Sequence, residues 1–341
     1  MAAPVVASVS PSQGSASGGT TVTVTGTGFT GAVTVRFGAK PATSFTVDSN
    51  TQITAVSPSG TGSVNVTVTT GQGTSSQLVP FGYTSAPSLT GLTPTQGPVS
   101  GGTTVTLTGT GLTGATAVSF GGVAATSFTV NSATQITAVT PPHTAGAAAV
   151  TVTTPGGTSN PDNPSAYFFY AASPSLTTVT PSSGSTVGGA TVVLVGNDLL
   201  GATAVSFGGV AATSFTVNSA TQITAVTPPH TAGTAAVTVT TPGGTSNAVD
   251  YLYLTLPTLL SLVPDQGPTH AGTVVTVTGT GLTTTTEVRF GSTPVAFTVV
   301  SPTQVTAVTP AGAGGPVSVT VTTAAGASNP LTYTRVPAPG I

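Results

Sequence analysis

The stretch TTVTVTG, residues 20–26, alternates threonine with valine. Successive side chains of an extended strand point to opposite faces of a sheet, so the valines share one face and the threonines the other. Both residue types are β-branched and favour strands. The pattern therefore predicts a strand with one buried face, and the same alternation recurs in AVTVRFG (32–38), SVNVTVTT (63–70) and AAVTVTTPGG (148–157).

Glycine and proline clusters divide the first 85 residues into short segments of this kind. They predict strands at 5–10, 20–26, 33–37, 43–47, 52–56, 63–69 and 78–83. Seven short strands with one apolar face each are typical of a two-sheet sandwich. No segment sustains a period of 3.6 residues, so we expect essentially no helix.

The same features return at intervals of 82 to 87 residues. A proline marks the start of each copy at positions 11, 94, 181 and 264, and the glutamine of TQIT or TQVT lies at 52, 135, 222 and 304. The 33 residues 114–146 are repeated without change at 201–233, which indicates a recent duplication. These repeats predict four domains, at 1–85, 86–172, 173–255 and 256–341.

The succession PVVASVSPSQGSASGGTTVTVTGTGF (4–29), followed by VRFG, TQITAVSP, VNVTVTT and FGY, resembles the immunoglobulin-like IPT/TIG domain. The resemblance covers nearly the whole chain, although copy three has VGNDLLG (195–201) and copy four has TPAGAGG (309–315) where other copies differ. It implies an all-β protein of four tandem early-set immunoglobulin-like sandwiches without disulfides. It implies no single function, because the family serves in surface receptors, bacterial surface proteins, starch-acting enzymes and transcription factors.

The links between the copies are short, and each ends in Pro87, Pro174 or Pro257. Proline fixes φ and restricts rotation at a joint. We therefore expect a semi-rigid, elongated rod, with each sandwich about 35–40 Å long from the rise of its strands.

Charge is scarce, with 4 Lys and Arg against 6 Asp and Glu in 341 residues. Nucleic-acid partners are excluded, because the chain cannot neutralise a series of phosphates. No apolar run approaches 18 residues, so no membrane span is expected. The chain has no cysteine for disulfides or thiolate metal sites. The first residues, MAAPVVASVSPSQG, lack the features of a signal peptide, which leaves the route of export open.

His143 and His230 occupy the two copies of TPPHTAG. A general base needs an orienting partner and a metal needs further ligands, yet neither loop contains Asp or Glu. We expect both histidines to be solvent-exposed turn residues. The six acidic residues are too scattered for a calcium loop or a glycosidase pair, although Glu287 and Arg289 are placed to pair along one strand.

The stretches GTGFTG (26–31) and GTGLTG (109–114) match the glycine pattern of dinucleotide-binding loops. That pattern requires a helix to follow, and here a strand follows. We therefore assign these glycines to turns that need positive φ. The sequence predicts no catalytic, cofactor-binding or metal-binding residue and no cofactor.

Aromatic residues recur at fixed places. Phe37, Phe120, Phe207 and Phe290 each precede a glycine, and Phe45, Phe128, Phe215 and Phe297 begin the next strand, so both sets are predicted to be core. Tyr167, Tyr170, Tyr251 and Tyr253 lie on last strands. They are predicted either to pack at joints between domains or to form an exposed stacking platform for a glycan.

The sequence favours a non-enzymatic structural or interaction protein, a tandem immunoglobulin-like rod for surface display, spacing, adhesion, or assembly into a filament or virion. Its partners would be proteins or further copies of itself, as a homo-oligomer or filament, with no nucleic acid. The expected location is extracellular, at a cell surface or in a virion. The alternative is an array of carbohydrate-binding accessory modules.

Overall fold

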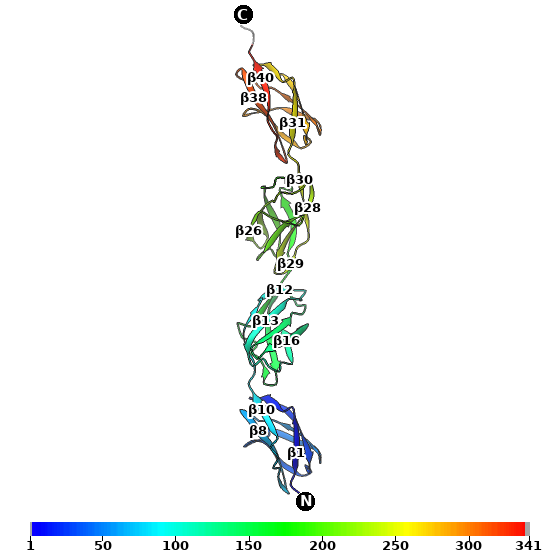
Figure 1. The fold of residues 1–341 in the computed structure, drawn as a ribbon, viewed down its shortest axis with the longest axis vertical. Helices are drawn as coiled ribbons and strands as arrows, with labels where there is room; N and C mark the ends of the chain where they lie inside the picture. The colour runs from blue at the N-terminus through cyan, green and yellow to red at the C-terminus, as the bar shows by residue number, and fades with distance from the viewer. Residues whose placement is uncertain (1, 338–341) are drawn as a thin grey trace. The chain divides into compact units, whose positions relative to one another are not determined.

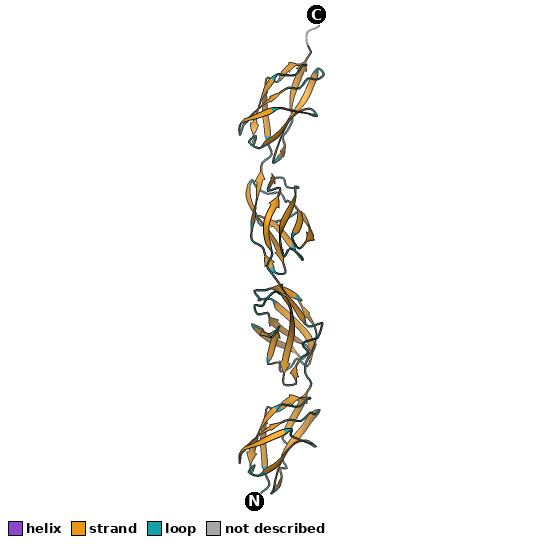
Figure 2. Cartoon of the chain, turned by 180° about the vertical axis from the view of Figure 1, so that it is seen from behind, coloured by secondary structure: helices purple, strands orange, loops and turns teal. Residues whose placement is uncertain are grey.

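The computed structural model describes residues 2–337, and within them the chain consists of strands joined by loops and turns (Figure 2). It divides into two compact units between Ala172 and Ser173, and each unit contains two sandwiches. Figure 1 labels some of the strands of each of the four successive sandwiches. None of the described residues forms a helix long and apolar enough to cross a membrane.

Ten strands form the first sandwich: β1 (Val5–Ser10), β2 (Gln13–Ser15), β3 (Thr21–Thr27), β4 (Ala32–Phe37), β5 (Lys40–Pro41), β6 (Ser44–Ser49), β7 (Gln52–Val56), β8 (Gly62–Thr70), β9 (Gly73–Thr74) and β10 (Pro80–Thr84). One sheet has the order β1-β3-β7-β6, all antiparallel. The other has the order β2-β10-β8-β4-β5, with β9 paired to β8. Its edge strand β2 runs parallel to β10.

The remaining sandwiches repeat this strand order. The second contains β11 (Ser88–Thr93), β12 (Gln96–Pro98), β13 (Thr104–Thr110), β14 (Ala117–Phe120), β15 (Val123–Ala124), β16 (Ser127–Ser132), β17 (Gln135–Val139), β18 (Gly146–Thr154), β19 (Gly157–Thr158) and β20 (Tyr167–Ala171). The third contains β21 (Ser175–Thr180), β22 (Ser183–Ser185), β23 (Thr191–Asn197), β24 (Ala204–Phe207), β25 (Val210–Ala211), β26 (Ser214–Ser219), β27 (Gln222–Val226), β28 (Gly233–Thr241), β29 (Gly244–Thr245) and β30 (Val249–Leu254).

The fourth sandwich contains β31 (Thr258–Val263), β32 (Gln266–Pro268), β33 (Val274–Thr280), β34 (Thr285–Phe290), β35 (Thr293–Val295), β36 (Phe297–Ser301), β37 (Gln304–Val308), β38 (Gly315–Thr323), β39 (Gly326–Ala327) and β40 (Leu331–Val336). The all-β prediction of four repeated immunoglobulin-like sandwiches is therefore confirmed. The seven strands predicted for the first copy correspond to β1, β3, β4, β6, β7, β8 and β10. The short strands β2, β5 and β9 were not predicted, because two or three residues carry no readable alternation.

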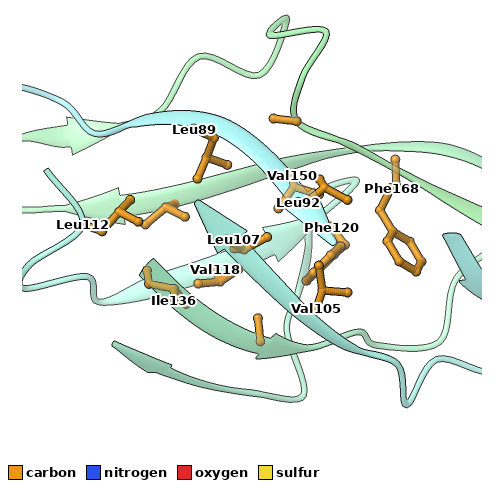
Figure 3. Packing of buried hydrophobic residues seen from close by; sticks show 14 of the residues in the cluster. Leu89, Leu92, Val105, Leu107, Leu112, Val118, Phe120, Ile136, Val150 and Phe168 are labelled. Carbon is orange, nitrogen blue, oxygen red and sulfur yellow. The ribbon is translucent and has the colours of Figure 1, made fainter. Parts of the chain in front are cut away.

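Each sandwich has its own apolar core between its two sheets. On β3, Val22 and Val24 are fully buried while the threonines beside them face outward or are only partly covered. In the second sandwich, Leu107 and Ile136 from one sheet point towards Val118 and Phe120 from the other (Figure 3). The first predicted set of phenylalanines is buried, and the second set packs partly buried against the cores.

The predicted turn role of the G-T-G glycines holds for Gly28 but not for Gly26, because Gly26 lies within β3 and does not have a positive φ. A Cβ on Gly26 would clash with the carbonyl oxygen of Val5, and Gly28 has φ of +75°. Copy three has Asp198 at the position of Gly28, and Asp198 adopts φ of +56°. Aspartate tolerates this left-handed conformation better than most residues, so the departure in the third copy leaves the turn intact.

A side-chain amide joins the two sheets of the third sandwich. The Leu176 amide donates to Asn247 Oδ1, and Asn247 Nδ2 donates to the Leu176 carbonyl, both at 2.9 Å. Asn329 makes the same pair of bonds to Leu259 in the fourth sandwich, at 2.8 and 3.1 Å. The asparagine side chain thus makes the pair of hydrogen bonds with the first strand of the sandwich that a neighbouring strand would otherwise make.

Replacing Asn247 by Ala should destabilise the third sandwich by about 1–3 kcal/mol, because two backbone groups of the nearly buried Leu176 lose their partners. Hydrogen exchange of the whole chain, read at β21, measures this as faster exchange of the Leu176 amide. Asn218→Ala is the matched control, since Asn218 bonds only to exposed side chains of the same domain. Equal exchange at β21 in both variants would contradict the role given to Asn247.

Candidate functional site

The two predicted histidines lie against tyrosines at one end of their sandwiches. The His143 ring stacks on that of Tyr170, with centroids 4.8 Å apart and planes 19° apart. His230 stacks on Tyr253 at 4.8 Å and 20°. The far edge of each imidazole, at Nε2, reaches the glycine turn after β14 or β24, at Gly121 and Gly208 respectively.

The predicted exposure of these histidines is therefore wrong for their rings, which are partly buried. The loop sequence alone does not indicate this burial, because the tyrosine that each ring contacts lies on a strand 27 residues further on for His143 and 23 for His230. Each ring Nδ1 lies 2.9 Å from the carbonyl oxygen of the next residue, Thr144 or Thr231. Among residues 2–337 no three His, Cys, Asp or Glu side chains are grouped as a metal site would need.

The first and fourth sandwiches have glycine at the place of these histidines. Tyr83 lies against Gly60 in the first, and the Arg335 guanidinium lies against Gly312 in the fourth. Arg335 also donates from Nη2 to the Pro310 carbonyl at 3.3 Å. The same place in the fold is thus occupied by histidine and tyrosine, by glycine and tyrosine, or by glycine and arginine.

Three of the four tyrosines singled out in the sequence belong to the cores. Tyr170, Tyr251 and Tyr253 are at most 1% exposed, so they offer no ring face to a sugar. The hydroxyl of Tyr253 donates to the Pro228 carbonyl at 3.0 Å. Burial, with a smaller contribution from the charge of Tyr251, raises the pKa of Tyr253 to about 12, although the Thr227 hydroxyl opposes the shift.

The fourth tyrosine, Tyr167, is 39% exposed on the outer face of β20. Phe169, two residues further on, is 50% exposed and points to the same face. Their neighbours across the sheet are Ala149 and Ala147 on β18. We call these four residues the Tyr167–Phe169 face. Its only ionisable group is the phenol of Tyr167. The sequence analysis missed Phe169, although strict alternation along YFFY would have placed it beside Tyr167.

The few charges are mostly paired or bonded locally. Arg289 Nε donates to Glu287 Oε2 at 2.7 Å, which confirms the predicted pairing along one strand. Arg36 occupies the same place in the first sandwich, where its Nη1 donates to the Ala39 carbonyl at 2.8 Å. Lys40 Nζ donates to the Ser59 carbonyl at 2.8 Å.

Titration of Tyr253 should weaken the fold at high pH. Its pKa is raised in the folded chain, so stability is complete below the ordinary value near 10 and is lost as the pH rises through about 12. The loss should approach about 2–3 kcal/mol. Burial also raises the pKa values of Tyr83, Tyr170 and Tyr251, so near-ultraviolet absorbance of phenolate in the native chain should show a late step whose amplitude Tyr253→Phe reduces and Tyr167→Phe leaves unchanged. A late step unchanged in Tyr253→Phe would contradict the assignment.

Comparison with known proteins places these features in a family. The IPT/TIG domain model matches residues 4–83, 87–167, 174–253 and 257–334. No curated protein matches the chain by sequence.

Solved structures with similar folds include the extracellular region of plexin A4, with 21% identity over 93% of this chain and 29% of that one, at a TM-score of 0.37. In a second structure of the plexin A4 extracellular region, this chain covers 48% of the length of the plexin chain. Invasin, a bacterial integrin-binding protein, shares 18% identity over 96% of this chain and 78% of its own, at a TM-score of 0.30. SGBP-B from a xyloglucan utilization locus of Bacteroides uniformis shares 22% sequence identity over 57% of this chain and 57% of its own, at a TM-score of 0.26.

Likenesses of this degree carry no information about what the chain binds. The domain model, by contrast, covers nearly every strand of all four sandwiches and the turn at Gly28. The chain belongs to the IPT/TIG domain family, with four such domains in tandem.

Proposed function

We propose that the chain is a non-enzymatic structural and interaction protein, a tandem immunoglobulin-like array that spaces, displays or attaches other molecules. The observation that carries this proposal is repetition, because one sandwich with one strand order is built four times. Repetition lengthens a chain and multiplies its surfaces. We place the domain boundaries at 85/86, 172/173 and 255/256.

The links support a stiff array. Pro87, Pro174 and Pro257 are buried, each at the start of the domain that follows it. The Ser85 carbonyl fits closely over Gly156, where a Cβ would clash with it. Leu256 also lies close to Gly326, with its Cδ2 3.0 Å from the position that a Cβ would take. The first and third links are thereby held by the domains that they lead into, which leaves fewer freely rotating residues at those joints.

The sheet edges support self-association or protein partners. The edge strands β16 and β26 have the same uncharged sequence, SFTVNS. Soluble proteins usually protect such edges with lysine or proline, and these two strands contain neither. With so few charges, copies of the chain repel one another little. We infer a homo-oligomer or filament outside the cytoplasm, at a cell surface or in a virion.

Small-angle X-ray scattering tests the array directly. Four sandwiches end to end should give a maximum dimension of about 140–160 Å, from the rise of their strands. Inserting two glycines between Ala172 and Ser173 should broaden the distance distribution and leave thermal unfolding almost unchanged, since it lengthens a link and touches no core.

The control is the same insertion between Pro161 and Asp162, two exposed residues of one loop in the second domain. It should leave the distribution as narrow as in the parent chain. A maximum dimension well under about 100 Å for the parent chain would overturn the proposal, since no extended arrangement of four such domains is that short.

The second candidate function is carbohydrate binding, and the Tyr167–Phe169 face favours it. Two exposed rings on alternate residues of one strand give a flat apolar surface on a sheet. The Ser119 and Thr151 hydroxyls, 2.8 Å apart on neighbouring strands, supply polar groups elsewhere on the second domain. We infer a neutral glycan, because β18 and β20 carry no acidic or basic side chain.

Co-sedimentation of the chain with insoluble starch, chitin and cell wall measures its binding to glycans. The double variant Tyr167→Ala/Phe169→Ala should lose at least about 1.5 kcal/mol of binding, or tenfold in affinity, because aromatic side chains dominate such contacts. Leu252→Ala is the matched control, since Leu252 is exposed at the equivalent place in the third domain. Binding that is equal in the parent chain and the double variant would contradict this role.

A further inference from the structure

We propose that the fourth domain carries a docking face for a second copy of this chain, on the outer side of its sheet β31-β33-β37-β36. This inference rests on the self-association proposed above, but it assigns that association to a different surface from the edge strands. Four valines that are 40–62% exposed form this surface, which we call the valine face: Val263, Val274, Val300 and Val308.

The strand pattern places all four valines on the same side of the sheet. On each strand the residue next to the valine faces the core, and these neighbours are Leu262, Val275, Val299 and Ala307. Val274 and Val308 pair directly across β33 and β37. Val263 pairs with Thr276, which lies two residues from Val274 on β33. Side chains that are paired or diagonal on one side of a sheet are within reach of one another, so these valines form one patch.

Val300 extends the patch to the far edge of the sheet. In the first three domains the residue at its position is hydrogen-bonded at 2.7 Å to the threonine in the middle of the neighbouring strand, in the pairs Asp48–Thr54, Asn131–Thr137 and Asn218–Thr224. Thr306 is that threonine in the fourth domain, and the valine side chain cannot bond to it. The four valines therefore surround the pair formed by Thr276 and Thr306.

The other domains have polar side chains at these places. The residues that correspond to Val263 are Ser10, Thr93 and Thr180. Those that correspond to Val274 are Thr21, Thr104 and Thr191. Single exposed apolar residues are common on protein surfaces, but a contiguous patch marks an interaction surface. One of four copies of the same sheet therefore carries a contact that the other three lack.

The shape of the valine face suits a protein partner. A hollow of about 110 Å³ lies in it, and its lining includes Val274, Val308, Thr298 and Thr306. Sites for small molecules are larger, at about 300–1,000 Å³. The hollow therefore favours a side chain from a partner surface over a free ligand.

Two properties favour a second copy of this chain as that partner. Strands β31, β33, β36 and β37 contain no Asp, Glu, Lys, Arg or His, so two identical faces meet without like charges. The core of the domain is itself two apolar sheet faces packed together, and a second copy supplies the matching apolar face. A two-fold axis makes such a contact self-complementary, because each copy then offers its hollow to the other.

The size of the valine face determines how strong the contact is. Four strands about 4.8 Å apart and about 20 Å long present roughly 400 Å² from each copy. The total of about 800 Å² lies below the about 1,200–2,000 Å² of stable complexes, so we expect a dissociation constant of about 0.1–1 mM. Chains displayed side by side reach such local concentrations, so the contact forms where copies are held together.

Sedimentation of the whole chain between about 10 µM and about 1 mM tests the valine face. The parent chain should associate reversibly over this range. The variant Val263→Thr/Val274→Thr/Val300→Asn should associate at least about tenfold more weakly, because three apolar side chains leave the contact. The introduced residues are those that the second domain has at the same positions, so thermal unfolding should be almost unchanged.

Two control variants separate this face from other surfaces. Val33→Thr/Val187→Thr/Leu200→Thr removes three similarly exposed apolar side chains from the first and third domains and should leave association unchanged. Thr129→Lys/Thr216→Lys places a lysine in each of the edge strands β16 and β26 and should also leave the dimer intact. Loss of association in this lysine variant alone would assign it to the edges and overturn the valine face.

The converse change builds the face elsewhere. Thr93→Val/Thr104→Val/Asn131→Val gives the second domain the same three valines, and this variant should form larger species than the parent chain, because each copy then has two faces. If the variant at Val263 fails to fold, this comparison still decides, and species no larger than the parent's would contradict the proposal. A parent chain that stays monomeric at about 1 mM would overturn it and would leave the scattering test of the array unaffected.

Discussion

Alternation of valine and threonine along the strands is the constraint on which the rest of the structure depends. It places valines such as Val22 and Val24 in the core, where each contributes about 1.5–3 kcal/mol on burial. It also fixes the pairing, because a slip of one residue would turn the apolar face to solvent. The turn at Gly28 then ends the strand, and the amide of Asn247 or Asn329 holds the first strand in place.

An almost uncharged surface follows from the same composition. Threonine and serine provide the polar side of each strand, so hydrogen bonds between hydroxyls take the place of ion pairs. The chain can therefore repeat one domain without building up charge. Distinct chemistry is left to a few positions, namely the Tyr167–Phe169 face and the end of each domain where His143, His230, Gly60 or Gly312 lies.

The sequence was sufficient to predict the class of fold, the number of repeats and most strands, because those depend on local alternation and on glycine and proline. It was insufficient where two distant segments meet. Nothing near His143 indicates that its ring stacks on Tyr170, and nothing near Asn247 indicates its bonds to Leu176. The identical stretches 114–146 and 201–233 nevertheless form the same stack at the same distance, so these contacts are reproducible consequences of the sequence.

The same limit applies to the tyrosines. A last strand near a domain end suggested an exposed platform, but the alternation of YFFY and YLY turns Tyr170, Tyr251 and Tyr253 inward. Only Tyr167 of the four keeps an exposed face, and the aromatic residue beside it is Phe169. Applying the period of two to the aromatic residues as well as to the valines would have predicted this division.

The central claim is that apolar burial and neutral hydrogen bonds, rather than charges, stabilise these domains. Denaturant unfolding at constant pH, repeated between about 0.05 and 0.5 M sodium chloride, tests it most directly. The account predicts that the free energy of unfolding changes by less than about 0.5 kcal/mol over this range, because screening acts on exposed ion pairs that contribute little. A decrease of about 2 kcal/mol or more on adding salt would contradict it, since a loss of that size requires charge pairs that hold the fold together.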